Sequence, residues 1–413
     1  MKLDLHSKKG SFTVFVTLAF AAVLIMVSAV LWASGQQAIS SCCESFGRLW
    51  GRSILAEYDI TLKERYGLFA FYGNEFLVEE KLDFYAGISF GSKDYIDYSG
   101  AVCSLDGWSL TDKDVFIKQA GETVMSGTVP LPVFREPADE NTDAAVTVRQ
   151  DRAITSQWIL KGLPSGGKGG GVSISSLISK LKEDMSISGI AGNATIDTYI
   201  FRFFRDYMDG EELGDTYFRG EIEYILSGRP DDVKSVKNVK NTLLALRNGL
   251  NLAYLYTCEE KAGAAMAAAE MITPGPAAVA TQAVILETWA YLEAKNDLEL
   301  LYDGQSVAVF KDDTNWALSL ENALQTETDD NVAGEESKKY VKPQNMSGIK
   351  YEDYLRILVA SLPESLKIQR VMDLIQINMK YLCCDWFLLE DYYGGLNFSF
   401  EVNGKKHEFE ETY

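Results

Sequence analysis

The chain opens with a long apolar run. Nearly every residue from Phe12 to Trp32 is apolar, and no charged side chain lies between Lys9 and Glu44. At a rise of about 1.5 Å per residue, this segment would span roughly 30 Å as a helix, which is the thickness of a bilayer's hydrocarbon core. We therefore expect a transmembrane helix at residues 11–34. Its membrane-anchoring side chains are expected to include Phe12, Phe15, Phe20, Leu24 and Trp32.

The run has the character of an anchor rather than of a cleaved signal peptide. A signal peptide has an apolar core of roughly 7–15 residues followed by a cleavage site of small residues. This run is longer, and it ends with Leu31 and Trp32 where small residues would be required. Lys2, Lys8 and Lys9 precede it. The positive-inside rule then leaves residues 1–10 as a cytoplasmic tail and places the rest of the chain outside the membrane.

The helical pattern continues beyond the apolar run. Apolar residues recur at steps of three and four from Ile39 to Leu62, while Glu44 and Arg48 fall on other faces of the helical wheel. We expect a long amphipathic helix at residues 35–65. The aromatic segment YGLFAFYG follows directly and is expected to cover its apolar stripe. That stripe consists of Ile39, Cys43, Phe46, Trp50, Ile54, Tyr58 and Leu62.

The next part of the chain is expected to mix strands and helices. Within residues 66–160, β-favouring residues dominate from Tyr95 to Leu110, and a helix is predicted from Thr111 to Met125. A further helix is predicted over residues 144–160. The glycine-rich segment 161–175 is expected to be a linker or loop, because glycine is its commonest residue and interrupts regular structure.

The remaining residues, 176–413, are mostly helical by their periodicity. Within them, GEIEYILSG at 220–228 is expected to be a short strand. Alternating apolar residues at 398–402 lead into Asn403-Gly404, a dipeptide typical of two-residue hairpin turns, so the chain is expected to end in a β-hairpin. The predicted fold class is α+β: a transmembrane helix, a long amphipathic helix, and a mainly helical ectodomain with small antiparallel sheet elements.

Composition describes an acidic, folded body. The formal net charge is −20 and the pI is about 4.6, which argues against nucleic acid as a partner because phosphate binding needs a basic surface. Hydrophobic residues make up 47% of the chain, so the region after the apolar run can bury a substantial core.

The glycine-rich segment nearly matches a phosphate-binding loop. Gly162, Gly167 and Lys168 reproduce G-x-x-x-x-G-K, but Gly169 stands where a serine or threonine should bind magnesium. The residues before it also have a helical pattern, whereas the motif requires a buried strand. We therefore predict no nucleotide or other cofactor at this loop.

Residues suited to catalysis are scarce. The two histidines are His6 in the expected cytoplasmic tail and His407 in the terminal hairpin, where an exposed position is expected. This distribution supports neither a Ser-His-Asp triad nor a histidine-based metal site. We predict a protein without catalytic, cofactor-binding or metal-binding residues. A hydrolase that uses paired carboxylates remains an alternative, and a deep acidic cleft would support it.

The six cysteines form two adjacent pairs and two single residues. An oxidising exterior would permit one or two bridges or leave the thiols free, and the sequence leaves both states open. Adjacent cysteines bridge each other only with strain, so buried packing is expected for the C-terminal pair. The cysteines are Cys42, Cys43, Cys103, Cys258, Cys383 and Cys384.

Several segments are similar to a known group of membrane proteins. KGSFTVFVTLAF resembles the start of the TadE/TadG-like pilus-assembly proteins, in which a basic residue and Gly-Ser open the transmembrane helix; Lys9, Gly10 and Ser11 match. AEYDITLKERYGLFAF, EIEYILSG, YEDYLRILVASLP and VMDLIQINM resemble blocks of an uncharacterised family of such proteins in Gram-positive anaerobes. The resemblance implies a pilin-like or accessory component of a Flp/Tad pilus or secretion system in the bacterial cell membrane.

The resemblance also implies a processing site and partners. Cleavage would fall between Gly10 and Ser11, and the partners would be the lipid bilayer and the Tad pilus platform or other pilin-like proteins. One departure counts against cleavage and against charge-directed packing, because Phe15 and Val16 stand where the family usually has glutamate. The alternative function is a membrane-tethered surface protein that binds an extracellular partner, and a weaker one is an anchored hydrolase.

Overall fold

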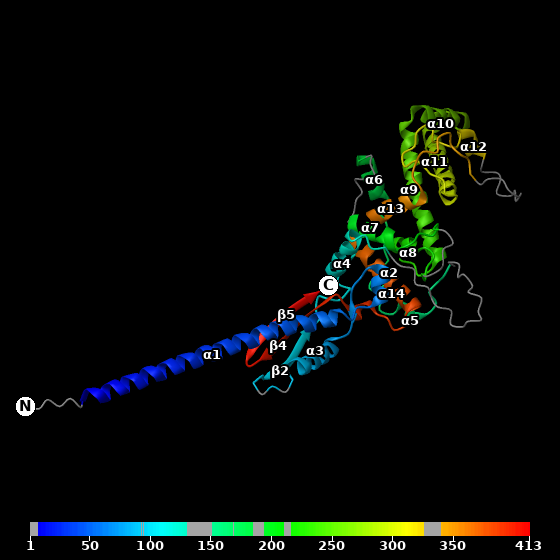
Figure 1. Cartoon of the computed structure of the whole chain (residues 1–413). Helices are drawn as coiled ribbons and strands as arrows, with labels where there is room; N and C mark the ends of the chain where they lie inside the picture. Colours follow the sequence, from blue (N-terminus) through cyan, green and yellow to red (C-terminus); the bar gives the residue numbers. More distant parts are fainter. Residues whose placement is uncertain are drawn as a thin grey trace, which may run out of the picture. The chain divides into compact units, whose positions relative to one another are not determined.

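The protein has an α+β fold in which helices predominate and the sheets are small and antiparallel (Figure 1). The computed structural model describes residues 7–91, 93, 95–129, 151–167, 169–184, 194–209, 216–325 and 340–413. Contacts within the chain divide it into two units. Unit 1 consists of Met1–Asp59, Phe69–Ser109 and Asp391–Tyr413, and unit 2 consists of Ile60–Leu68 and Leu110–Glu390.

Unit 1 is built on one long helix and a three-stranded sheet. The helices are α1 (Ser7–Leu55) and α3 (Glu75–Phe90), and the sheet has the order β2 (Tyr98–Ser104), β4 (Gly395–Val402), β5 (Lys405–Thr412). Both strand pairs are antiparallel. A separate antiparallel pair joins β1 (Phe71–Tyr72) to β3 (Tyr392–Tyr393).

The terminal hairpin agrees with the sequence prediction. Asn403 and Gly404 connect β4 to β5 with φ values of 52° and 75°. Positive φ at both central positions matches the twist of a two-residue hairpin, which is why Asn-Gly is favoured there. The strand expected between Tyr95 and Leu110 is present as β2.

One face of the sheet carries the core of unit 1. The alternate β4 residues Leu396, Phe398, Phe400 and Val402 are buried, and they pack against the second half of α1 and against α3. Trp50 of α1 lies at the centre, with its ring centroid 4.9 Å from that of Phe400. The other contributors are Cys43, Ile54, Leu55, Phe71, Val78, Leu82, Ala86, Phe90, Cys103 and Leu105.

The amphipathic helix expected at residues 35–65 is two helices. α1 ends at Leu55, and α2 (Ile60–Tyr66) begins after a break. The break arises because Tyr58 forms an isolated antiparallel bridge with Phe71, and the Asp59 N–H donates to the Ala70 carbonyl. Backbone groups committed to pairing with a strand cannot also continue the i to i−4 bonds of a helix.

Unit 2 is helical in the part that the structure describes. Its longest helices, α9 (Asp232–Thr257) and α11 (Ala278–Tyr302), pack against each other, and α10 (Glu259–Ile272) packs on both. α14 (Glu364–Leu382) is buried almost throughout. The other α-helices described in unit 2 are α2 (Ile60–Tyr66), α4 (Lys113–Met125), α5 (Gln157–Leu160), α6 (Ile174–Asp184), α7 (Ala194–Phe203), α8 (Glu221–Ser227), α12 (Leu320–Gln325) and α13 (Tyr351–Ser361).

Two sequence predictions for unit 2 are corrected. GEIEYILSG is the helix α8, which ends at Gly228 with φ 65°, a left-handed helix cap. Every residue from Glu221 to Leu226 is buried, both glutamates included, so the segment lacks the division into an apolar and a polar face that marks a surface helix. The helix expected over 144–160 is helical only at α5 among its described residues, 151–160.

The units cut across the linear divisions expected from the sequence. Residues 176–413 were expected to form one part, whereas β3, β4 and β5 belong to unit 1. The reason is the pairing of β4 with β2 along the register that places Phe398 opposite Cys103. A pairing across almost 300 residues leaves no local signal in either strand.

Candidate functional site

The first half of α1 is the clearest candidate for a functional surface. From Phe12 to Trp32 its large apolar side chains are exposed by 46–71%. This helix has the length and composition to cross a membrane, a test that an N-terminal signal sequence also passes. The expected anchor residues Phe12, Phe15, Phe20, Leu24 and Trp32 all lie on this segment and are exposed.

The expected processing site also lies on this helix. α1 begins at Ser7, so the backbone of Gly10 and Ser11 is helical. The side chain of Ser11 lies outside the described part of the structure. Cleavage between them stays a prediction. Phe15, which stands where a carboxylate is usual, projects from α1 with most of its surface exposed.

The second half of the same helix is core. Its first buried residue is Ser40, and Cys43, Gly47 and Gly51 follow on the face that meets the sheet. A Cβ at Gly47 would overlap the ring of Phe409, and one at Gly51 would lie 2.7 Å from Glu411 Cγ. Glycine is required here because β5 approaches the helix backbone itself. α1 is therefore both a candidate membrane span and a structural element of unit 1.

His407 is buried, contrary to the expected surface position. Only 5% of it is exposed, and its ring stacks on Phe400 with centroids 5.7 Å apart. Burial lowers the pKa of this imidazole below its usual value, Lys405 lowers it further, and Glu44 opposes both. His407 is therefore a core residue: its neutral ring packs on the inward face of β5. The inward position follows from the alternation on β4, to which it is paired.

The cysteines divide between core and surface. Cys42 is exposed and Cys43 is buried, at consecutive positions of α1, and both are thiols. Burial, with the nearby Glu75 and Glu79, raises the pKa of the Cys103 thiol to about 12, which leaves it protonated and unreactive. Cys383 is exposed and Cys384 half-buried, so the expectation of buried packing for this pair is wrong.

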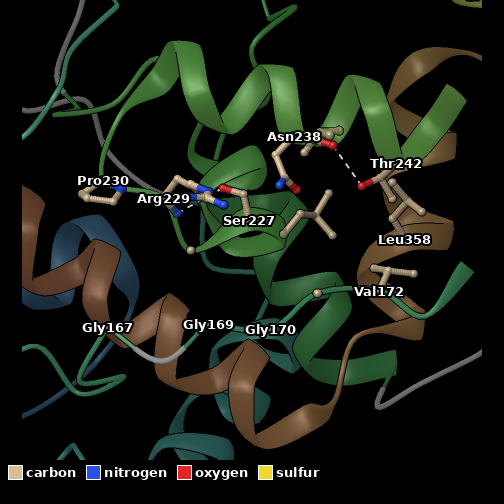
Figure 2. Close-up of a pocket in the computed structure, with 14 residues that line it drawn as sticks. Gly167, Gly169, Gly170, Val172, Ser227, Arg229, Pro230, Asn238, Thr242 and Leu358 are labelled. Atoms are coloured by element: carbon tan, nitrogen blue, oxygen red, sulfur yellow. Dashed lines mark hydrogen bonds between the residues drawn. The ribbon is translucent and has the colours of Figure 1, made fainter. Parts of the chain in front are cut away.

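The glycine-rich segment borders a pocket in unit 2. The described residues of 161–173 form a loop, and Ile174 already begins α6, so the loop expected at 161–175 ends two residues earlier. Its glycines line one wall of a pocket of about 450 Å³. Figure 2 shows this run opposite α9, whose Asn238 and Thr242 face the space between them. Ser227 and Arg229, from the end of α8, complete the polar lining. The Thr242 hydroxyl donates to the Asn238 carbonyl at 2.9 Å.

Arg370 links two parts of the pocket lining. Its Nη2 donates to the Gly170 carbonyl at 2.7 Å, and its Nη1 donates to the carbonyls of Ile225 and Leu226 at 2.8 and 2.9 Å. A Cβ at Gly228 would lie 2.7 Å from this guanidinium. The arginine thus ties the loop to the end of α8. Sequence reasoning missed it, although the glycine that follows α8 was a signal for a helix end.

The pocket is suited to binding. Its described lining consists of glycines, apolar side chains, and the amide, hydroxyl and guanidinium groups named above. None of these lining residues is a carboxylate, histidine or cysteine, so a Ser227 or Thr242 hydroxyl has no general base beside it there. Such a lining offers hydrogen bonds to a small polar molecule.

The carboxylates with raised pKa values lie inside unit 2. Burial raises the pKa of Glu223 to about 7, and its oxygens accept from the Tyr351 hydroxyl at 2.7 Å and from the Tyr207 N–H at 3.1 Å. Burial and the neighbouring Asp209 raise the pKa of Asp206 to about 6. Glu223 has no exposed surface, so a substrate has no access to it.

A second buried group of charges is also structural. Arg247 and Lys311 both bind Asp297, at 2.8 and 2.7 Å, and Lys311 reaches Glu293 at 2.8 Å. Each charge is matched by an opposite charge inside unit 2. In the described part of the chain, no group of three or more His, Cys, Asp and Glu residues is arranged to hold a metal ion.

Comparison with known proteins gives one match. Residues 141–404 match DUF5702, a family of unknown function. No curated protein matches the chain, and no solved structure matches it. The matched region covers more than half of the chain and begins after α1, so the family match does not include the candidate membrane span.

Proposed function

This chain belongs to DUF5702, a family of unknown function, and we propose that it is a non-enzymatic, single-pass membrane protein with an extracytoplasmic body. The observation that carries the proposal is the continuity of α1, which runs unbroken from Ser7 to Leu55. From Phe12 to Trp32 its exposed surface is mainly apolar, and one face of its second half is buried in unit 1. A helix in this arrangement connects bilayer and body without a flexible linker.

Charge supports an orientation with the N-terminus inside. Lys2, Lys8 and Lys9 precede the apolar run, and the first acidic side chain after it is Glu44. Lysines next to a span favour the cytoplasmic side. The body, which carries all of the acidic excess behind the chain's net charge of −20, would then lie outside the cell membrane.

We further propose a pilin-like or accessory role in a Tad-type pilus or secretion system. The support is the resemblance of KGSFTVFVTLAF to TadE/TadG-like proteins, together with a rigid helix whose exposed half can pack against partner helices in the bilayer. Phe15 and Val16 replace the usual carboxylate. That replacement favours an accessory component at the platform over a filament subunit.

Intact mass of the protein extracted from native membranes tests the anchor. A full-length chain supports an uncleaved anchor, and a chain that begins at Ser11 supports processing of the prepilin type. A chain that begins near Gly35 would overturn the anchor, because the apolar half of α1 would then be a removed signal.

A photo-crosslinker tests the pilin-like role. With p-benzoylphenylalanine in place of Phe15, we expect adducts to Tad platform proteins in cells that carry the system. The matched position is Leu49, which is also exposed on α1 but lies beyond the apolar run. If the crosslinker at position 15 forms adducts with lipid alone, the pilin-like role is overturned and α1 serves only as a membrane tether.

The pocket between the glycine-rich loop and α9 favours a second candidate function. A tethered surface protein that captures a small polar molecule or a polar group of an extracellular partner would use this pocket. The two candidates differ in genetic context, since neighbouring genes for a Tad ATPase and platform proteins support the pilus role and their absence supports the tether.

A further inference from the structure

β5 runs beside α1 in a defined direction. Lys405 Nζ donates to Ser40 Oγ at 2.5 Å, Phe409 packs on Gly47, and the Tyr413 hydroxyl donates to the Leu55 carbonyl at 2.5 Å. Fifteen helical residues span about 22 Å and eight strand residues about 26 Å, so helix and strand advance together. The hairpin turn before Lys405 therefore points along α1 toward its apolar half (Figure 1).

The loop before β2 is joined to this turn. The Asp97 N–H donates to Asn403 Oδ1 at 2.8 Å, the Asn403 N–H donates to the Asp97 carbonyl at 2.9 Å, and Asn403 Nδ2 donates to the Tyr95 carbonyl at 3.2 Å. Loop and turn thus form one edge of unit 1. We call this edge the rim, and it comprises residues 93, 95–97 and 403–406.

Helix geometry sets the height of the rim above the apolar run. The run ends at Trp32, the next half-buried residue of α1 is Gln36, and the first buried one is Ser40. These four to eight residues correspond to about 6–12 Å along the axis. The headgroup layer adds roughly 5–8 Å to each side of the hydrocarbon core. If Trp32 lies at the edge of that core, the rim meets the headgroups.

The side chains of the rim suit this position. Tyr95 is 64% exposed, and tyrosine favours the membrane interface because its ring is apolar and its hydroxyl polar. Lys93 and Lys406 are exposed. Lys406 pairs with the exposed Glu408 at 2.7 Å, and a surface pair of this kind is weak enough for both lysines to reach lipid phosphates. Asp97 and Glu401, also exposed, bring negative charge to the same end of the sheet. Both signs together match a zwitterionic headgroup layer better than a strongly anionic one.

We propose that the rim binds the headgroups of zwitterionic phospholipids and holds unit 1 against the outer surface of the bilayer. This inference rests on the proposed membrane anchor. α1 provides one attachment and the rim a second, at a different point of the same rigid unit. Two attachments restrict the tilt of unit 1 relative to the membrane plane, so the unit is presented in a fixed orientation.

The test uses the full-length protein in phosphatidylcholine nanodiscs, with p-benzoylphenylalanine at one position at a time. Tyr95→p-benzoylphenylalanine probes the rim, and Phe20→p-benzoylphenylalanine probes the span. The matched control is Tyr72, which is 49% exposed and belongs to β1, next to the bridge at Tyr58 beyond the end of α1. After irradiation, we expect lipid adducts by mass at positions 20 and 95, and at least about tenfold less at 72.

The controls separate this inference from the anchor itself. Adducts at position 20, with no more at 95 than at 72, would overturn the rim and leave the anchor intact. Absence of adducts at position 20 would overturn the anchor and the rim with it.

The lysines are tested by charge removal. In Lys93→Gln/Lys406→Gln we expect the adduct yield at position 95 to fall about tenfold, the size of one lost charge-assisted hydrogen bond. Both side chains are exposed, so the fold should tolerate the change. Lys81→Gln, which removes an exposed lysine on α3 paired with Glu57, serves as the control. An unchanged yield in the double variant would overturn the assignment of phosphate binding to these lysines.

Discussion

The ring of Phe409 on β5 lies directly against the backbone of Gly47 on α1, in space that a Cβ at position 47 would occupy. Four residues later, Gly51 stands under Phe398 and Glu411 in the same way. The pair Gly47-x-x-x-Gly51 therefore sets how closely the sheet approaches the helix. Through this contact, the helix with the apolar first half is part of the core of unit 1.

Gly47→Ala should destabilise the protein. We expect the free energy of unfolding to fall by about 1–3 kcal/mol, because the added methyl group overpacks a closed contact. Alanine's better helix propensity, worth about 1 kcal/mol, only partly offsets this loss. Thermal unfolding of the full-length protein in detergent, followed by near-ultraviolet circular dichroism, measures the change.

The matched control is Gly87→Ala on α3, where nothing lies within 4 Å of the added Cβ. This variant should be as stable as the wild type or more stable, by up to about 1 kcal/mol. Equal stability of the two variants would contradict the close approach of β5 to α1.

Leu24→Arg should weaken membrane association. Leu24 lies in the middle of the apolar run, where an arginine costs roughly 3 kcal/mol of insertion free energy. Leu49→Arg makes the same substitution at another exposed α1 position, beyond the run. After alkaline carbonate extraction, we expect Leu24→Arg to be depleted from the membrane pellet and Leu49→Arg to remain in it. Equal retention of both would argue against residues 12–32 as the span.

Stability should fall as the pH rises from about 4.5 to 7. Glu223 has an ordinary pKa of 4.5 and a pKa of about 7 in the fold, and Asp206 is raised from 3.8 to about 6. In this window the folded state binds more protons than the unfolded state, so each step up in pH favours unfolding. At about 1.4 kcal/mol per pKa unit, the contribution of Glu223 is on the order of 3 kcal/mol.

Glu223→Gln should flatten this dependence. Glutamine keeps an oxygen for the Tyr207 N–H and carries no charge to desolvate, so denaturant midpoints between pH 5 and 7 should vary less than in the wild type. Glu408→Gln, at an exposed carboxylate paired with Lys406, should leave the slope unchanged. If the denaturant midpoints of the wild type and Glu223→Gln change with pH in parallel, the buried carboxyl of Glu223 does not retain its proton in the folded state.

Arg370→Met should loosen the pocket and destabilise unit 2. The change leaves the carbonyls of Gly170, Ile225 and Leu226 without this donor, and one unsatisfied buried carbonyl costs about 1–3 kcal/mol. Hydrogen exchange should then rise in residues 169–173 and at the end of α8. Arg356→Met removes an arginine that pairs with Glu352 at i,i+4 and lies over the Phe201 ring, 4.1 Å from its centroid. This control should lower stability by no more than about 1.5 kcal/mol. Unchanged exchange in Arg370→Met would refute its role in holding the loop.

Local patterns were sufficient for the elements that depend on near neighbours. The apolar first half of α1 follows from composition alone, and the β4–β5 hairpin follows from alternation into Asn403-Gly404. The helical character of most of unit 2 follows from periodicity. The loop at 161–173 follows from its glycines. Each of these elements depends on residues that are close together in the chain, so its pattern can be read from the sequence.

The tertiary structure alone decided which surfaces these elements share. It packed one face of residues 40–55 of α1 against a sheet formed from both ends of unit 1 and turned His407 inward. It also made GEIEYILSG a helix and bound Arg370 to the glycine-rich loop. Each of these outcomes depends on partners far away in the chain, such as Phe409 for Gly47 and Gly170 for Arg370. A side chain is buried or exposed according to what packs on it, and the sequence alone does not name that partner.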